Sequence, residues 1–217
     1  MVALLSSPPV RRPLLRGYAH LLAALVAPFA LLALLLAADS PRAYVGGALF
    51  GAALILLFST SATYHVVSWG SRGRAIMRRL DHAMIFVAMA GLYAPFCLQA
   101  MHLAWGIPIL CVVGGLALVG VVLKVVWIQP PQWVNLACYL AVGWVAIVAI
   151  PAVRLEPLSV VAVVASGLLF TAGGVCFASR RPRLFPRIFG HHEVFHVAVV
   201  MACALLYVVV LQSVLPG

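Results

Sequence analysis

The feature that most constrains the fold of this chain is a series of seven apolar stretches, each long enough to cross a membrane. A helix needs roughly 20 apolar residues to span the hydrocarbon core, where the backbone must satisfy its own hydrogen bonds. The predicted spans cover residues 18–38, 44–67, 81–100, 105–128, 133–152, 158–178 and 191–214. No linker between them is long enough to separate two domains. The sequence therefore predicts an all-α integral membrane protein, with residues 1–217 forming a single bundle of seven transmembrane helices after a short tail of about 17 residues.

The composition excludes the main soluble alternatives. The chain is 65% hydrophobic and only 8% charged, whereas soluble domains are about half apolar and a quarter charged. A water-soluble globule and a disordered chain are both excluded by these values. The five cysteines are an odd number, lie in apolar stretches and show no disulfide-framework spacing.

The net charge of +10 is distributed in a way that indicates a membrane surface and not nucleic acid. The basic residues form short clusters between apolar runs, as in cytoplasmic loops that face anionic lipid headgroups. We therefore expect membrane lipids as partners and no nucleic acid. The sequence leaves the oligomeric state open.

The basic residues also predict an orientation. If seven spans alternate, only Arg42 and Arg154 fall on one side of the membrane. The other side receives Arg11, Arg12, Arg16, Arg72, Arg74, Arg78, Arg79, Lys124, Arg180, Arg181, Arg183 and Arg187. This asymmetry predicts a cytoplasmic N-terminus and an external C-terminus in the plasma (bacterial inner) membrane. A cleaved signal peptide is the less favoured alternative for the first span, because its apolar run exceeds the usual signal core.

Lys124 is the one basic residue that lies inside a predicted span, the fourth. It stands near the cytoplasmic end of that span. A lysine stem can run along the apolar surface while its ammonium group reaches the interface. We therefore expect Lys124 to extend out of the membrane.

Three polar clusters lie at the cytoplasmic ends of spans. Ionisable residues in a membrane span cost free energy and usually have a functional role. Ser61 and His65 close the second span, and Asp81 opens the third. His192 and His196 lie in the first turns of the seventh. The orientation derived from the basic residues places all three clusters at the same membrane depth.

The spacing of the histidines predicts a metal site. His192 and His196 are four residues apart, so both imidazoles point to one side of a helix, whereas His191 cannot share that side. Three imidazoles with one open position form a catalytic type of Zn²⁺ site. We expect His65, His192 and His196 to bind Zn²⁺ near the cytoplasmic face. Asp81 is positioned to hold or deprotonate a water molecule at such a site, and Ser61 lies on the same face of its helix as His65.

Other interpretations of these histidines remain open. A histidine pair at this spacing also occurs in ordinary helix packing. Residues 192–196 match H-E-x-x-H, the zinc-binding motif of metalloproteases, in which the glutamate is the general base. That interpretation leaves His65 without a role. Interfacial or supporting positions are expected for His20, His82, His102 and His191.

Four segments together resemble one known family along nearly the whole chain. They are Ser61-x-x-x-His65, Arg78-Arg79-Leu80-Asp81-His82-Ala83, Ala90-Gly91-Leu92-Tyr93-Ala94-Pro95-Phe96 and Phe189-Gly190-x-His192-Glu193-x-Phe195-His196. The sequence resembles the hemolysin III family, the bacterial branch of the progestin and adiponectin receptor superfamily. The resemblance implies a seven-helix bundle with zinc bound by His65, His192 and His196. It also implies that Asp81 binds the metal through water and that Ser61 supports the site.

The resemblance leaves several functions open. Relatives in the superfamily include receptors with ceramide-hydrolysing activity, and bacterial members are linked to membrane lipid homeostasis. The first hypothesis is a zinc-dependent hydrolase of lipid amides or esters, in which Asp81 and Ser61 are the catalytic residues. The second is a non-enzymatic lipid sensor in which zinc is structural. A cytolysin is less favoured, because the spans lack the charged amphipathic face of a self-assembling pore.

Overall fold

Helices make up most of the computed structural model, which describes residues 13–127, 130–182, 184–185 and 187–215. Their order is α1 (Tyr18–Ala37), α2 (Pro41–Val66), α3 (Ser71–Leu98), α4 (Leu103–Val126), α5 (Gln132–Gly143), α6 (Val145–Ala149), η1 (Ile150–Ala152), α7 (Pro157–Ser179), α8 (His191–Val209) and η2 (Val210–Val214). Seven helices or helical runs are long and apolar enough to cross a membrane. The predicted seven-span, all-α fold is therefore confirmed, while its orientation stays a prediction. Arg11, Arg12, Arg183 and Gly217 lie outside the described residues.

Two spans differ from their predicted form. The third was expected to begin at Asp81, but α3 begins at Ser71, so the arginine-rich segment that was expected to be a loop is helical. Arginine, methionine and leucine favour helices, but the charge of the arginines hides the segment from a search for apolar stretches. The fifth span is interrupted at Trp144 and consists of α5, α6 and the short η1 helix.

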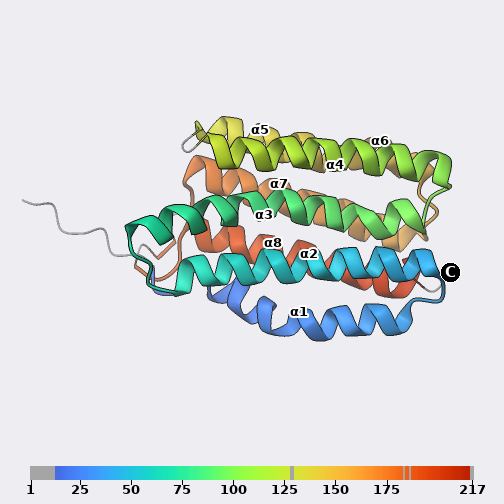
Figure 1. Cartoon of the computed structure of the whole chain (residues 1–217), viewed down its shortest axis with the longest axis horizontal. Helices are drawn as coiled ribbons and strands as arrows, with labels where there is room; N and C mark the ends of the chain where they lie inside the picture. Colours follow the sequence, from blue (N-terminus) through green and yellow to red (C-terminus); the bar gives the residue numbers. More distant parts are fainter. Residues whose placement is uncertain (1–12, 128–129, 183, 186, 216–217) are drawn as a thin grey trace, which may run out of the picture.

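The helices pack mainly against their neighbours in the chain. Contacts are most extensive between α2 and α3, α3 and α4, α7 and α8, and α1 and α2. In Figure 1, α1 to α4 run alongside one another, with α7 and α8 behind them. About half of the apolar window of α2 and α3 is buried, compared with 17% in α1 and 11% in α7. Helices α2 and α3 therefore form the protein core, and the outer helices expose apolar side chains, as expected in lipid.

The contact between α2 and α3 depends on small residues. A Cβ atom at Gly91 would lie 2.3 Å from the Cβ atom of Ala53, so no larger residue fits at Gly91 without a shift of the helices. Small residues at membrane helix interfaces permit such close approach and favourable van der Waals packing. This contact fixes α2, which carries His65 in its last turn, against α3, which carries Asp81.

Candidate metal centre

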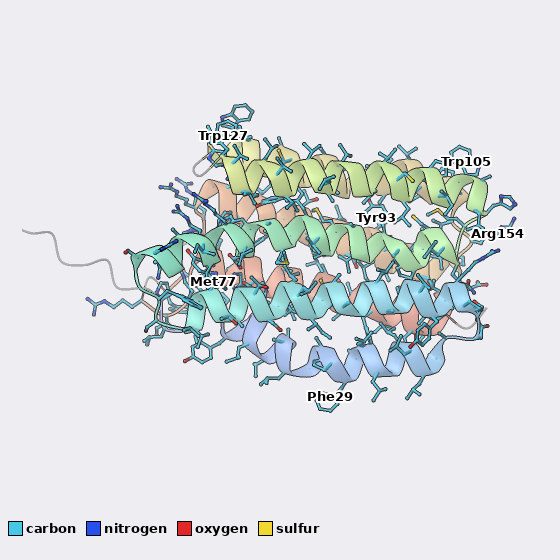
Figure 2. All side chains as sticks on the ribbon, in the orientation of Figure 1. Phe29, Met77, Tyr93, Trp105, Trp127 and Arg154 are labelled. Atoms are coloured by element: carbon cyan, nitrogen blue, oxygen red, sulfur yellow. The ribbon has the colours of Figure 1, made fainter. Side chains whose placement is uncertain are left out.

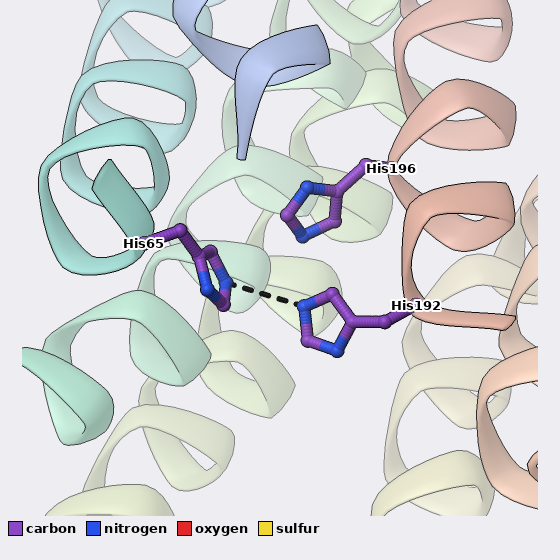
Figure 3. Close-up of side chains that lie close together, drawn as sticks. All are labelled: His65, His192 and His196. Carbon is purple, nitrogen blue, oxygen red and sulfur yellow. Dashed lines mark hydrogen bonds between the residues drawn. The ribbon is translucent and has the colours of Figure 1, made fainter. Parts of the chain in front are cut away.

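Three histidines from two helices meet at one end of the bundle. His65 lies in the last turn of α2, and His192 and His196 lie in the first two turns of α8. One ring nitrogen from each lies within 4.8 Å of the other two. The Nε2 atoms of His65 and His192 are 3.2 Å apart, and Figure 3 shows all three rings directed at a common point.

The arrangement of these nitrogens fits a tetrahedral metal ion. A Zn–N bond of 2.0–2.1 Å places two nitrogen ligands about 3.3 Å apart, close to the spacing of His65 and His192. The Nδ1 atom of His196 is buried and has no hydrogen-bond partner among the described residues. Neutral imidazole nitrogens are common zinc ligands. The three side chains that were expected to bind zinc therefore meet in a geometry that can do so.

The start of α1 closes the site on one side. Gly17 adopts φ 86°, a conformation that favours glycine. A Cβ atom at this position would lie 2.5 Å from the Cβ atom of His65. Both features require glycine here, because the backbone of the segment that enters α1 lies directly against a candidate metal ligand.

Asp81 lies next to the histidines but outside their cluster. Its Oδ2 atom is 3.8 Å from the Nε2 atom of His65 and 3.8 Å from the Nδ1 atom of His82. The His82 ring is held by a 2.7 Å hydrogen bond between its Nδ1 atom and the carbonyl oxygen of Arg78. Ser61 is buried, and its side chain lines the same cavity as Asp81. Asp81 is thus close enough to act on a molecule held by the histidines.

Glu193 is turned away from the histidine cluster. Its Oε1 atom accepts a 2.9 Å hydrogen bond from Nε of Arg16, and its Oε2 atom accepts a 2.7 Å hydrogen bond from the backbone nitrogen of Gly190. The second bond caps the start of α8. Both carboxylate oxygens therefore have structural partners, which counts against the interpretation of Glu193 as the general base of an H-E-x-x-H protease.

The remaining histidines take different positions. His20 was expected near an interface or in a supporting position, and it is 2% exposed and stacked on His196, with ring centroids 3.9 Å apart and planes 6° apart. His102 caps the start of α4. His191 lies beside Phe177 and is not part of the histidine cluster, as predicted. The sequence shows that His20 lies near the start of a span. Residue spacing does not predict that its ring contacts His196.

The expectation for Lys124 was wrong. Its side chain does not extend to the interface: the residue is 7% exposed and lies inside the protein. Its Nζ atom donates a hydrogen bond to Oδ1 of Asn135 and lies 5.3 Å from the centre of the Tyr139 ring. Both partners are on α5, whose approach to α4 gives the lysine an internal alternative to the membrane surface.

A cavity of about 470 Å³ connects the histidines to the interior of the bundle. Near the histidines it is lined by polar side chains that include His20, Ser61 and Asp81. Most of the remaining lining is apolar and comes from five membrane-spanning segments, with Leu57, Met89, Leu92, Phe96, Ile147, Ile150, Val163 and Val199 among its residues. The cavity thus combines a polar end with an apolar body, as a lipid combines a polar headgroup with apolar chains.

Comparison with known proteins places the chain in a family. The profile of the family described as "Haemolysin-III related" matches residues 9–207. The chain belongs to this family. The hemolysin-III-related match includes every residue of the histidine cluster. The chain is 26% identical to "Hemolysin-3" of Bacillus cereus over 212 residues, which is 95% of this chain and 94% of the relative. It is 27% identical to a "Hemolysin-3 homolog" of Bacillus subtilis over 165 residues, covering 75% and 74% of the two chains.

Proposed function

We propose that this hemolysin-III-related protein is a zinc-dependent hydrolase of lipid amides, similar to ceramidases, with a role in membrane lipid homeostasis. The observation that carries the proposal is the position of the three-histidine cluster at the polar end of a largely apolar cavity of about 470 Å³. Ligand cavities of enzymes are commonly apolar with a few converging polar groups. The size and polarity of this cavity suit a long-chain lipid.

The proposed ligands are His65, His192 and His196. Zinc, when bound, supplies a Lewis acid that polarises a carbonyl group and activates water. The helices contribute the rigid support that such a site requires. His65 is held against Gly17, and His192 and His196 stand in successive turns of one helix whose start is fixed by Glu193.

Asp81 is the proposed general base. A carboxylate can accept a proton from water and return it to the leaving nitrogen, and the 3.8 Å separation from His65 places it within reach of a bound molecule. Ser61 lines the cavity beside this carboxylate and supports its orientation. The apolar body of the cavity is suited to hold acyl chains and to exclude bulk water from the amide.

A structural role for zinc is the second candidate. The cluster joins α2 to α8, so a metal ion here would tether these two helices, and the segment that enters α1 covers it through Gly17. In that case the protein would act as a lipid sensor without turnover. The two candidates share the same ligands, and only an assay of chemistry separates them.

The proposal is tested with the purified full-length protein reconstituted in phospholipid, using long-chain ceramide as substrate and elemental analysis for zinc. The Asp81→Asn variant should keep its zinc and fold but lose about 100- to 10,000-fold in rate, as is typical when a general base is removed. Ser61→Ala should lose less.

Two outcomes would contradict parts of the proposal. If zinc-loaded wild-type protein hydrolyses neither lipid amides nor lipid esters, the structural role is preferred. If Asp81→Asn loses zinc as fully as His65→Ala, Asp81 is a direct ligand and its role as a base is wrong.

A further inference from the structure

A second polar cluster lies between α4 and α5 and contains none of the three histidines of the metal centre. It consists of Lys124 near the end of α4 and of Asn135 and Tyr139, which are one turn apart on α5. Figure 2 places Trp127, just beyond the end of α4, at the same end of the bundle as Met77 of α3. The cluster and the histidines therefore lie at the same end of the molecule.

The positive charge of Lys124 is not neutralised by the protein. The chain has only four acidic residues, all within the described part, and none lies within 4.0 Å of the Lys124 ammonium group. Its recorded partners are the amide oxygen of Asn135 and the face of the Tyr139 ring. Both are neutral. A buried cation held only by neutral groups creates a region of positive potential inside the bundle.

The two partners of Lys124 also face the cavity. Because the ammonium group can only donate, Asn135 must turn its oxygen toward Lys124, which leaves its two N–H donors for other partners. The hydroxyl group of Tyr139 is buried and has no hydrogen-bond partner among the described residues. Asn135 and Tyr139 both line the large cavity. This wall therefore presents hydrogen-bond donors with a positive charge behind them.

The position of the Tyr139 ring is fixed by packing. It contacts Phe86 of α3 at a centroid distance of 5.0 Å, and Phe86 is fully buried against α4. The only carboxylate that lines the cavity within the described residues is Asp81, which lies beside His65 and whose charge also acts on Tyr139. An anion bound at Asn135 and Tyr139 would have hydrogen-bond donors and the Lys124 charge on one side, while most of the remaining lining of the cavity is apolar.

We propose that Asn135 and Tyr139, with Lys124 behind them, form a binding site for the negatively charged headgroup of a lipid, either a phosphate or a carboxylate. The acyl chain of this lipid occupies the apolar body of the cavity. Lys124 is a positioning residue that orients Asn135 and supplies the favourable potential. This inference rests on the proposed function only because both place a lipid in the same cavity. Binding of an anionic headgroup at this site does not require hydrolysis.

The test measures binding to the purified full-length protein by native mass spectrometry with three probes of equal chain length. Hexadecyl phosphate, hexadecanoate and hexadecanol contain no amide or carboxylic ester, so their binding is independent of the proposed hydrolysis. At least one anionic probe should bind about tenfold or more tightly than the alcohol, because hydrogen bonds to charged groups are the stronger ones. The comparison of phosphate with carboxylate identifies the headgroup.

Matched variants locate the site. Tyr139→Phe removes only the hydroxyl group and should weaken anion binding several-fold, and Lys124→Met should abolish the preference for anions. Tyr207→Phe is the control, because the Tyr207 hydroxyl donates to the carbonyl oxygen of Ala30 and this residue does not line the cavity. If Lys124→Met does not fold, Tyr139→Phe decides the question alone.

Three results would overturn the proposal. The first is equal binding of hexadecanol and both anions to the wild type. The second is unchanged anion binding by Tyr139→Phe. The third is anion binding that is lost in His192→Ala but kept in Lys124→Met, which would place the anion at the metal centre.

Discussion

The Nε2 atoms of His65 and His192 lie 3.2 Å apart, although 127 residues separate them in the chain. Two neutral imidazoles can share one N–H···N hydrogen bond at this distance, and two zinc ligands have nearly the same spacing. The third ring favours the second explanation. His196 brings another nitrogen within 4.8 Å of both, and a single hydrogen bond gives it no role.

Zinc content distinguishes these explanations. Wild-type protein purified without chelator should contain about one zinc ion per chain, and His65→Ala or His192→Ala should remove most of it because each deletes a proposed ligand. Both variants should also unfold at lower temperature, since the tether between α2 and α8 is lost. Elemental analysis and thermal unfolding measure the two effects.

His191→Ala is the matched control for this experiment. His191 precedes His192 in the same helical turn but lies beside Phe177, outside the cluster. Its replacement should leave the zinc content unchanged. Equal zinc in wild type and His192→Ala would show that the histidines do not hold the metal.

The ion pair between Arg16 and Glu193 should contribute to stability and not to chemistry. The Glu193 side chain is 2% exposed, so Arg16→Gln leaves a buried carboxylate with only its bond to Gly190. We expect a loss of about 1–3 kcal/mol in the free energy of unfolding, the usual cost of leaving a buried polar group unpaired. Zinc content should not change.

Glu193→Gln tests the protease interpretation directly. The glutamine can still accept the hydrogen bond that caps α8, so the fold should persist. Lipid hydrolysis should continue at a rate close to that of the wild type. Complete loss of activity with full zinc content would instead identify Glu193 as the general base.

The fold was predictable from the sequence because the membrane imposes a simple rule. A helix that crosses lipid needs a long apolar run, and such runs were visible without any knowledge of packing. The meeting of His65 with His192 and His196 followed from alternation of the spans. These expectations required only the depth of each residue in the membrane. That depth follows from the position of the residue within its own apolar stretch.

The parts that failed depend on neighbouring helices. Lys124 was expected at the surface because its position along α4 is close to a membrane interface, but its rotation about the helix places it toward Asn135. His20 takes one of the positions expected for it, a supporting one, but its stack on His196 depends on how α1 packs against α8 and was not predicted. The depth of a residue in the membrane can be predicted from hydropathy. The rotation of a helix about its axis and the identity of its neighbouring helices depend on tertiary packing.

The predicted orientation is tested with reporter fusions. A fusion at Gly70, just before α3, should lie in the cytoplasm, and one at Gly217 should lie outside, because basic residues are retained on the cytoplasmic side. Substituting acidic residues for Arg72, Arg74, Arg78 and Arg79 should weaken this preference. A cytoplasmic C-terminus in the wild type would contradict the predicted direction or the number of spans that cross.

The stack of His20 on His196 predicts a difference between two substitutions. His20→Ala leaves a cavity beside a proposed zinc ligand and should cost about 2–5 kcal/mol in stability, together with some zinc affinity. His20→Phe keeps a flat ring against His196 and removes two buried nitrogens. Its cost should be smaller, because the ring fills the space that alanine would leave empty, although the larger ring introduces some strain. Thermal unfolding and zinc content compare the variants, and a His20→Phe protein as impaired as His20→Ala would show that the nitrogens of His20, and not its stacking, support the site.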